Sequence, residues 1–230
     1  MNNIYINGKY LEKHPDWHEK DAQLKADQIL FFLKKNNMLP TTLSEIGCGS
    51  GEILKILSKK MIYCQSFTGY EISPQAFEIC KKKQCKLVEF VFGDSFSDDK
   101  RFDIVLCIDV IEHIQDYYSF LKNVKRKGSY FLFRIPLDLT MISTIKSGYF
   151  SRLKNTLGHI HFFNLDIAID ALKSVGYEII DFQYVACAKK AKDMGVKQRI
   201  SHLFFKVLYF FNRNISVRFF GGCSLMVLAK

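Results

Sequence analysis

The sequence predicts an α/β fold built on a doubly wound, mostly parallel sheet of about seven strands. Two observations predict it. Apolar, strand-like runs alternate with amphipathic, helix-like runs over residues 41–136, which is the pattern of parallel βαβ units. A glycine-rich turn joins the first strand to the first helix of this series. Right-handed crossovers between parallel strands then give a Rossmann-like architecture.

The glycine-rich turn is Gly47-Cys48-Gly49-Ser50-Gly51, after the apolar strand that begins at residue 41. Glycine at every second position allows positive φ angles and leaves no Cβ between the main chain and a ligand. Ser50 is expected to cap the following helix. Cys48 occupies a variable position of the turn, and we interpret it as filler.

An acidic residue follows the glycine-rich turn at a spacing that is typical of nucleotide-binding folds. The second strand, over residues 61–70, ends in Glu71, and 71 − 51 gives 20 residues from the last glycine. At this place a doubly wound fold holds a ribose by its two hydroxyls. Glu52 replaces the third glycine of a dinucleotide fingerprint. A nucleoside ligand without a pyrophosphate therefore fits better than NAD.

The other elements follow in order along the chain. An N-terminal helix is expected over residues 16–36, with Trp17 as either a lid residue or a hydrophobic anchor. After Glu71 the pattern predicts further strands at 87–92, 102–108, 129–135, 178–185 and 223–229, the first of which leads into Gly93-Asp94-Ser95. It predicts helices at 75–83, through 118–124 and at 164–176. Residues 137–163 are expected to form a loop or a short helix.

Composition is consistent with one domain over residues 1–230, because 230 residues with 48% hydrophobic content can bury one sizeable core. No apolar run of 18 residues is present, so no membrane-spanning helix is expected. Seven cysteines without a C-x-x-C pair indicate free thiols in a reducing cytoplasm.

The net charge of +10 is concentrated in one segment. Residues 186–220 hold eight basic residues and one acid, and 8 − 1 gives seven of the ten excess charges. Apolar residues recur there at helical spacing from Ile200 to Phe211. Three interpretations stay open: packing on the domain or on a second copy in a homodimer, contact with an anionic membrane surface or a lipid-linked acceptor, and RNA binding.

The motif Glu45-Ile46-Gly47-Cys48-Gly49-Ser50-Gly51, together with Glu71, resembles motifs I and II of the class I S-adenosylmethionine-dependent methyltransferases. The resemblance covers roughly residues 16–185 and 221–230, and it implies that the strands at 178–185 and 223–229 are the antiparallel pair that completes the sheet, with an antiparallel C-terminal strand. It implies that S-adenosylmethionine is the cofactor and S-adenosylhomocysteine its product. The cofactor-binding residues that it implies are Glu45, Gly47, Cys48, Gly49, Gly51, Glu71, Ile72, Gly93, Asp94, Ser95 and Asp109.

The resemblance also implies which parts of the chain contact the cofactor and which contact the substrate. Residues 1–36 form an N-terminal arm and lid helix, residues 41–136 the cofactor-binding half, and residues 137–230 the substrate side with the basic aromatic insertion at 186–220. Within the cofactor site, the glycines hold the methionine portion, Glu71 the ribose, and Asp94 with Ser95 the adenine.

Three histidines are candidate bases, since a hydroxyl acceptor must lose a proton near working pH. His113 follows the fourth strand, and His159 and His161 follow the fifth. Each has a structural alternative, in capping, packing or local hydrogen bonding. A metal held by His159 and His161 lacks a third ligand in the sequence, and we predict no metal site.

The acceptor class is narrowed by two absences from the sequence. No Asn/Asp-Pro-Pro-aromatic motif follows the fourth strand, and no Pro-Cys pair is present, so DNA base methylation by either route is disfavoured. We expect a cytoplasmic enzyme, with the inner membrane face as a peripheral site, that O-methylates a small molecule or a glycan- or lipid-linked precursor. The alternatives are an RNA methyltransferase that uses residues 186–220 and a non-catalytic cofactor-binding partner subunit.

Overall fold

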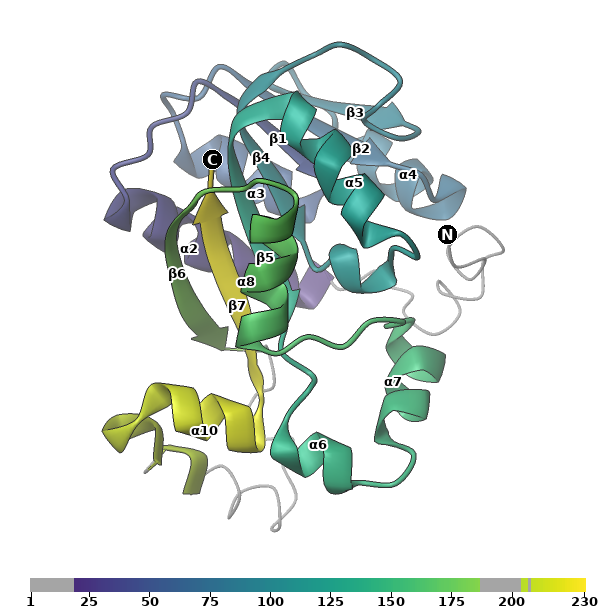
Figure 1. Cartoon of the computed structure of the whole chain (residues 1–230). Helices are drawn as coiled ribbons and strands as arrows, with labels where there is room; N and C mark the ends of the chain where they lie inside the picture. The colour runs from purple at the N-terminus through teal and green to yellow at the C-terminus, as the bar shows by residue number, and fades with distance from the viewer. Residues whose placement is uncertain (1–18, 187–203, 207) are drawn as a thin grey trace.

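A computed structural model describes residues 19–186, 204–206 and 208–230. They form a seven-stranded sheet flanked by helices, with further helices beyond one end of the strands (Figure 1). The expected helix start at Asp16, the residue Trp17 and most of the basic part of residues 186–220 lie outside the described residues. None of the described helices is long and apolar enough to cross a membrane.

The sheet has the strand order β3-β2-β1-β4-β5-β7-β6. Neighbouring strands from β3 to β5 are parallel, and β7 is antiparallel to both β5 and β6. The strands are β1 (Thr42–Ile46), β2 (Ser66–Glu71), β3 (Val88–Phe92), β4 (Phe102–Ile108), β5 (Gly128–Pro136), β6 (Ile179–Ala186) and β7 (Cys223–Ala229). The predicted fold class is confirmed, and the last two strands form its antiparallel part.

The helices connect these strands and add a separate group after β5. They are α2 (Glu19–Lys35), α3 (Glu52–Lys60), α4 (Pro74–Cys80), α5 (Tyr117–Val124), α6 (Met141–Ile145), α7 (Tyr149–Leu157), α8 (Leu165–Ser174) and α10 (Arg213–Phe220), with single 3-10 turns η2 (Lys81–Lys83), η3 (Ile111–His113) and η4 (Lys125–Lys127). Residues 137–163, expected as a loop or short helix, contain α6 and α7.

Two hydrophobic clusters cover the two faces of the sheet. One joins α2, α3 and α4 to inward side chains of the sheet, with Phe32 and Leu57 fully buried. The other joins α5 and α8 to the opposite face, with Leu121 and Leu172 fully buried. Alternation of side chains along each strand supplies both clusters. The sheet is therefore a fixed layer whose strand ends can present polar groups.

The first residues of the predicted second strand are not extended in the structure. Met61 ends α3, because its amide donates to the carbonyl of Leu57, and β2 begins only at Ser66. The expected Ser50 cap is wrong, since the N-cap is Gly51, with φ 73° and no side-chain cap. A left-handed residue there lets the main chain turn directly from the glycine-rich turn into α3.

Gly69 in β2 lets the glycine-rich turn pack against the sheet. A Cβ at this position would lie 2.7 Å from Cδ1 of Phe90, 2.8 Å from Sγ of Cys48 and 2.9 Å from Cδ1 of Leu54. These distances are shorter than van der Waals contact. The turn and α3 therefore approach the sheet only because residue 69 has no side chain.

We expect Gly69→Ala to lower the free energy of unfolding by about 1–3 kcal/mol, because the added methyl group overpacks this contact. Urea unfolding of Gly69→Ala, Phe90→Leu and the double variant measures the effect. The clash predicts that the double variant is more stable than the sum of the single effects. Strict additivity of the two substitutions would contradict this account of Gly69.

Candidate functional site

The carboxyl ends of the parallel strands open into a cavity of about 1130 Å³. The glycine-rich turn and the ends of β2, β3, β4 and β5 line one part of it. Tyr149, Leu153 and Leu157 of α7 line another part. Ligands of open α/β sheets bind at this edge. The cavity is therefore lined both by predicted cofactor-binding residues and by residues of the predicted substrate side.

Three positive φ angles shape the glycine-rich turn, 73° at Gly47, 54° at Gly49 and 73° at Gly51. The amides of Gly47 and Cys48 donate to the carbonyl of Tyr70 at 2.9 and 3.1 Å. A Cβ on Gly51 would lie 2.5 Å from the ring of Phe90. The turn is thus pinned to β2 on one side and leaves its main chain open to the cavity.

Glu71 links the glycine-rich turn to the next loop. One carboxylate oxygen accepts from the amide of Gly49 at 2.7 Å, and the other accepts from the amide of Ser73 at 2.8 Å. Burial raises the pKa of Glu71, while these amides act to lower it. Each oxygen keeps a second lone pair, so the carboxylate can accept two hydroxyl donors as well.

The loop after β3 lies beside Glu71 along the cavity wall, with Ile72, Gly93, Asp94 and Ser95 in the lining. Gly93 has a φ of 125°. The carboxylate of Asp94, an exposed residue, accepts from the amide of Phe96 at 2.9 Å. The Oγ of Ser95 is buried and has no hydrogen-bond partner among the described residues. The loop therefore offers polar groups to a ligand.

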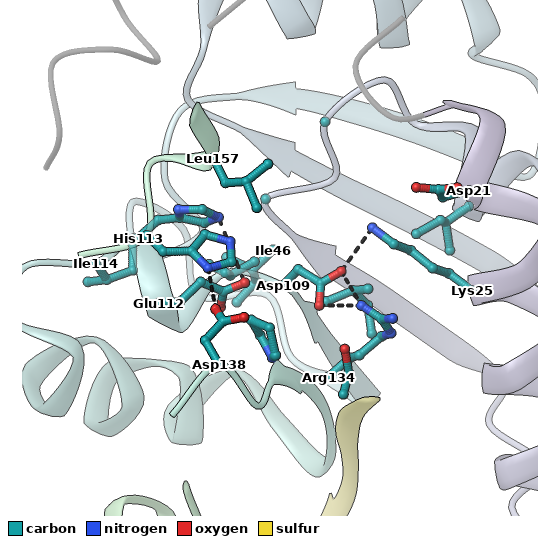
Figure 2. A pocket seen from close by; sticks show the side chains of 18 of the residues that line it. Asp21, Lys25, Ile46, Asp109, Glu112, His113, Ile114, Arg134, Asp138 and Leu157 are labelled. Carbon is teal, nitrogen blue, oxygen red and sulfur yellow. Dashed lines mark hydrogen bonds and ion pairs between the residues drawn. The ribbon is translucent and has the colours of Figure 1, made fainter. Parts of the chain in front are cut away.

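Asp109, the last predicted cofactor residue, lies between two cations (Figure 2). Both of its oxygens lie 2.5 Å from Nη1 of Arg134, and Nζ of Lys25 lies 2.9 Å from Oδ2. Burial alone would raise the pKa of Asp109, but the charges of Arg134 and Lys25 hold it well below its usual range. Its φ of 56° is one of two positive values at described non-glycine residues. The two ion pairs can offset that backbone strain.

Glu45 is buried at the end of β1 and lines the cavity. Its Oε2 has no hydrogen-bond partner among the described residues. Burial raises the pKa of Glu45 to about 8, Lys25 opposes that change, and Glu71 adds to it. A buried carboxyl that lacks a donor is suited to an incoming cationic group.

The structure brings two of the three predicted histidines together. The rings of His113 and His159 meet edge to face with centroids 5.0 Å apart, and both residues line the cavity. Nδ1 of His159 lies 2.6 Å from Oδ2 of Asp138, and Nδ1 of His113 lies 3.1 Å from the carbonyl oxygen of Gly158. This pair faces the same space as the glycine-rich turn.

His161 lies apart from that pair. Its Nε2 is 3.2 Å from the carbonyl oxygen of Gln115, and its ring packs on Tyr117 with centroids 4.8 Å apart. It is not among the residues that line the cavity. Of the two histidines in the loop after β5, only His159 therefore lies where an acceptor can reach it.

Glu112 completes the group around the two imidazoles. Its side chain is fully buried, and neither carboxylate oxygen has a hydrogen-bond partner among the described residues. Burial, with the charge of Asp109 adding to it, raises the pKa of Glu112 well above its ordinary value. Figure 2 shows Glu112, His113 and Asp138 on one side of the cavity and the Asp109 ion pairs on the other.

Sequence reasoning missed Lys25, Arg134 and Asp138. Arg134 interrupts the apolar strand at 129–135, and a charge at a buried strand position is a usable signal. Asp138 follows the fifth strand, where polar residues of open sheets meet ligands. Lys25 is one of several lysines in α2, and the sequence carries no mark of its pairing with Asp109.

The site fits the amino-acid and nucleoside parts of S-adenosylmethionine. The glycine-rich turn gives close main-chain access, and Glu45 presents an unpartnered carboxyl oxygen beside it. Glu71 keeps acceptor capacity for a pair of ribose hydroxyls. The unpartnered Oγ of buried Ser95 lies in the loop beyond them. These groups follow one another along one wall.

Comparison with known proteins decides the family. The model of a methyltransferase domain family matches residues 17–181. The chain belongs to this family. The prediction of a class I S-adenosylmethionine-dependent methyltransferase is thereby confirmed.

Two relatives and one solved structure define the likeness further. A ubiquinone biosynthesis O-methyltransferase of Coxiella burnetii is 26% identical in an alignment of length 177 that covers 68% of this chain and 68% of the relative. The enzyme of that name from Actinobacillus pleuropneumoniae is 24% identical over 54% of this chain and 61% of its own. Magnesium protoporphyrin IX methyltransferase of Synechocystis, solved with bound S-adenosylhomocysteine, superposes with a TM-score of 0.60 at 14% identity, over 90% of this chain and 81% of that chain.

Glu45→Gln should change how stability depends on pH. Because the pKa of Glu45 rises from 4.5 to about 8 on folding, the carboxyl favours the folded state below about pH 4.5 and loses this effect as the pH rises through about 8. Wild type should therefore weaken relative to Glu45→Gln across this range, by at most about 5 kcal/mol (3.5 × 1.36). Urea unfolding of both proteins at several pH values measures it. A constant difference would contradict the burial argument.

Proposed function

We propose that this methyltransferase transfers the methyl group to a hydroxyl oxygen of a small acceptor with an apolar body. The observation that carries the proposal is the shared cavity, which joins the glycine-rich turn and Glu71 to His113 and His159. The two relatives named for O-methylation support an oxygen acceptor. The match spans 61% of one relative's length and 68% of the other's. Their substrates are not carried over.

The cofactor-side residues bind and orient. When bound, S-adenosylmethionine supplies an activated methyl group on a sulfonium. In this proposal Gly47, Gly49 and Gly51 with Glu45 hold its amino-acid end, and Glu71 with Ile72 holds the ribose. Gly93, Asp94 and Ser95 hold the adenine, while Asp109 fixes the wall between cofactor and acceptor and Cys48 fills the turn. Orientation of this kind contributes about 7–11 kcal/mol to a two-reactant step.

The acceptor-side residues supply an apolar wall and a polar end. Tyr149, Leu153 and Leu157 of α7 line the cavity and contribute the wall. His113 and His159 contribute the polar end, where an acceptor hydroxyl can be held while it loses its proton. Residues 137–230 are therefore assigned to the substrate. This arrangement places a small hydroxylated acceptor ahead of the RNA and partner-subunit alternatives.

Glu71→Ala should weaken S-adenosylhomocysteine binding at least tenfold in calorimetry, because it removes charge-assisted bonds to both ribose hydroxyls and unties Gly49 from the sheet. Glu78→Ala is the matched control. Glu78 is an exposed carboxylate on the next helix, paired with Lys81 at 2.6 Å, and its loss should leave affinity within twofold. Equal affinities of the two variants would overturn the assignment of Glu71.

A second part of the proposal concerns the mouth of the cavity. Large apolar side chains are exposed on α6 and on residues 204–219, and we call them the mouth patch: Met141, Ile145, Phe204, Phe210, Phe211, Ile215 and Phe219. Phe210 is 85% exposed and Ile145 79%. α10 packs on α6 beyond the carboxyl ends of the strands (Figure 1). Lys146, Phe205 and Phe220 from the same segments line the cavity.

We propose that the mouth patch rests on an anionic membrane surface and admits an acceptor with a lipid tail. Apolar side chains flanked by exposed cations suit such a surface, and Lys146, Lys206 and Arg213 are exposed beside them. A peripheral position at the cytoplasmic face follows from this proposal. A free small molecule or a glycan-linked acceptor, and a homodimer through the same patch, are the competing outcomes.

The double variant Phe210→Ser, Phe211→Ser should pellet several-fold less with phosphatidylglycerol vesicles than wild type does, because it removes two exposed anchors. Phosphatidylcholine vesicles should pellet little of either protein. The control is Leu39→Ser, Ile62→Ser, since these residues are 72% and 91% exposed at the amino end of the strands. Equal pelleting of all three proteins would end the membrane proposal, and a loss of dimer by gel filtration in the first variant would replace it.

A further inference from the structure

Three side chains at the acceptor end of the cavity have the spacing of metal ligands. Among the residues that the structure describes, Glu112, His113 and His159 form one such group, with one ligand atom from each within 4.8 Å of the others. They come from the turn after β4 and the loop after β5, 46 residues apart (159 − 113). The sequence offered His159 and His161 without a third ligand. The fold instead pairs His159 with His113 and adds Glu112.

The tautomers of both histidines are fixed in the orientation that metal ligation needs. A carbonyl oxygen of Gly158 and a carboxyl oxygen of Asp138 face the two Nδ1 atoms, so the hydrogen bonds assign the ring hydrogen to Nδ1 of His113 and to Nδ1 of His159. In this tautomer Nε2 of each ring has the lone pair that a metal ion needs. A carboxylate behind a histidine is the usual outer support of a metal-ligating imidazole. Asp138 holds that place at 2.6 Å from His159.

Glu112 gives a second, independent observation. Its side chain is fully buried, and both oxygens lack a hydrogen-bond donor among the described residues. The nearest imidazole nitrogen, Nε2 of His113, lies 3.8 Å from Oε1, which is too far for a hydrogen bond. A buried carboxyl group whose oxygens have no donor is left unsatisfied, and a bound cation would satisfy it. Because Glu112 lies beside the imidazoles of His113 and His159, such a cation would be a metal ion bound by all three side chains.

We propose that Glu112, His113 and His159 form a binding site for one divalent transition-metal ion, with Asp138 as a positioning residue. Two imidazoles and one carboxylate suit zinc, manganese or iron and leave coordination positions open toward the cavity. Ligands bound at about 2.1 Å lie roughly 3–3.4 Å apart, so ligand atoms that now lie within 4.8 Å of one another would come closer when the ion binds.

The role of the ion rests on the proposed function. Facing the cavity, it coordinates the acceptor hydroxyl, lowers its pKa and holds its oxygen toward the cofactor side, and the released proton passes to solvent. An acceptor with two neighbouring oxygens would occupy two open positions. In this account His113 and His159 both act as ligands, and no histidine acts as the base.

The test titrates the chelator-treated full chain with MnCl₂ alone and follows the electron paramagnetic resonance signal of the free ion. Manganese is the probe because thiolates, including the described free cysteines, compete poorly for it. Wild type should bind one ion per chain. Glu112→Gln and His159→Gln should each bind at least tenfold more weakly, and Asp138→Asn about 10- to 100-fold more weakly through loss of its support.

His161→Gln is the matched control, since it changes the same residue type two positions from His159 and lies outside the group. Its manganese affinity should stay within twofold of wild type. Absence of saturable binding to wild type, or equal binding by Glu112→Gln, His159→Gln and His161→Gln, overturns the site. Should Glu112→Gln fail to fold, His159→Gln and Asp138→Asn decide the outcome.

S-adenosylhomocysteine calorimetry on the same proteins separates the two proposals. Retained affinity in each variant shows that the fold and the cofactor side are intact, so a loss of manganese binding then reports on the ligands. A wild type that binds manganese but not S-adenosylhomocysteine keeps the metal site and overturns the proposed function. The reverse result overturns the metal site and keeps the function.

Discussion

The carboxylate of Glu71 is the constraint on which the cofactor side depends. It accepts from Gly49 in the turn after β1 and from Ser73 in the loop after β2, so one side chain sets the distance between two strand ends. The parallel register of β1 and β2 brings those ends side by side, with Ile46 opposite Tyr70. Because the carboxylate is buried, its bonds to main-chain amides are stronger than they would be in water.

The predictable part of the molecule is the part whose cause is local. Glycines at positions 47, 49 and 51 mark a turn because only glycine adopts these φ angles freely, and all three values are positive. The strand at 102–108 and the strand at 223–229 match β4 and β7 residue for residue, since continuous apolar runs have clear ends. The prediction for Ser50 is wrong because a serine before a helix commonly caps it, whereas here the next residue, Gly51, is the N-cap of α3.

The unpredictable part depends on contacts between distant residues. Asp109 meets Lys25 from 84 positions earlier (109 − 25) and Arg134 from the neighbouring strand, and no periodicity encodes either pairing. In the sequence, Glu112 looks like an ordinary acidic residue of a helical turn. In the structure it is buried where no described residue donates a hydrogen bond to its carboxylate oxygens. The same holds for the histidines, because only the fold decides that His159 turns toward Asp138 while His161 packs on Tyr117. The sequence shows residues that can bind a ligand or take part in catalysis, but it does not show which side chains they contact.

The position of β7 has a consequence for the making of the protein. β7 follows both β5 and β6 in the sequence but lies between them in the sheet, so this interior strand is synthesised after both of its neighbours. Until Cys223–Ala229 emerges, β5 and β6 have no common partner and their main-chain edges are open to other chains. The sheet can therefore be completed only after β7 has been made, and loss of this strand would separate β6 from the other five strands.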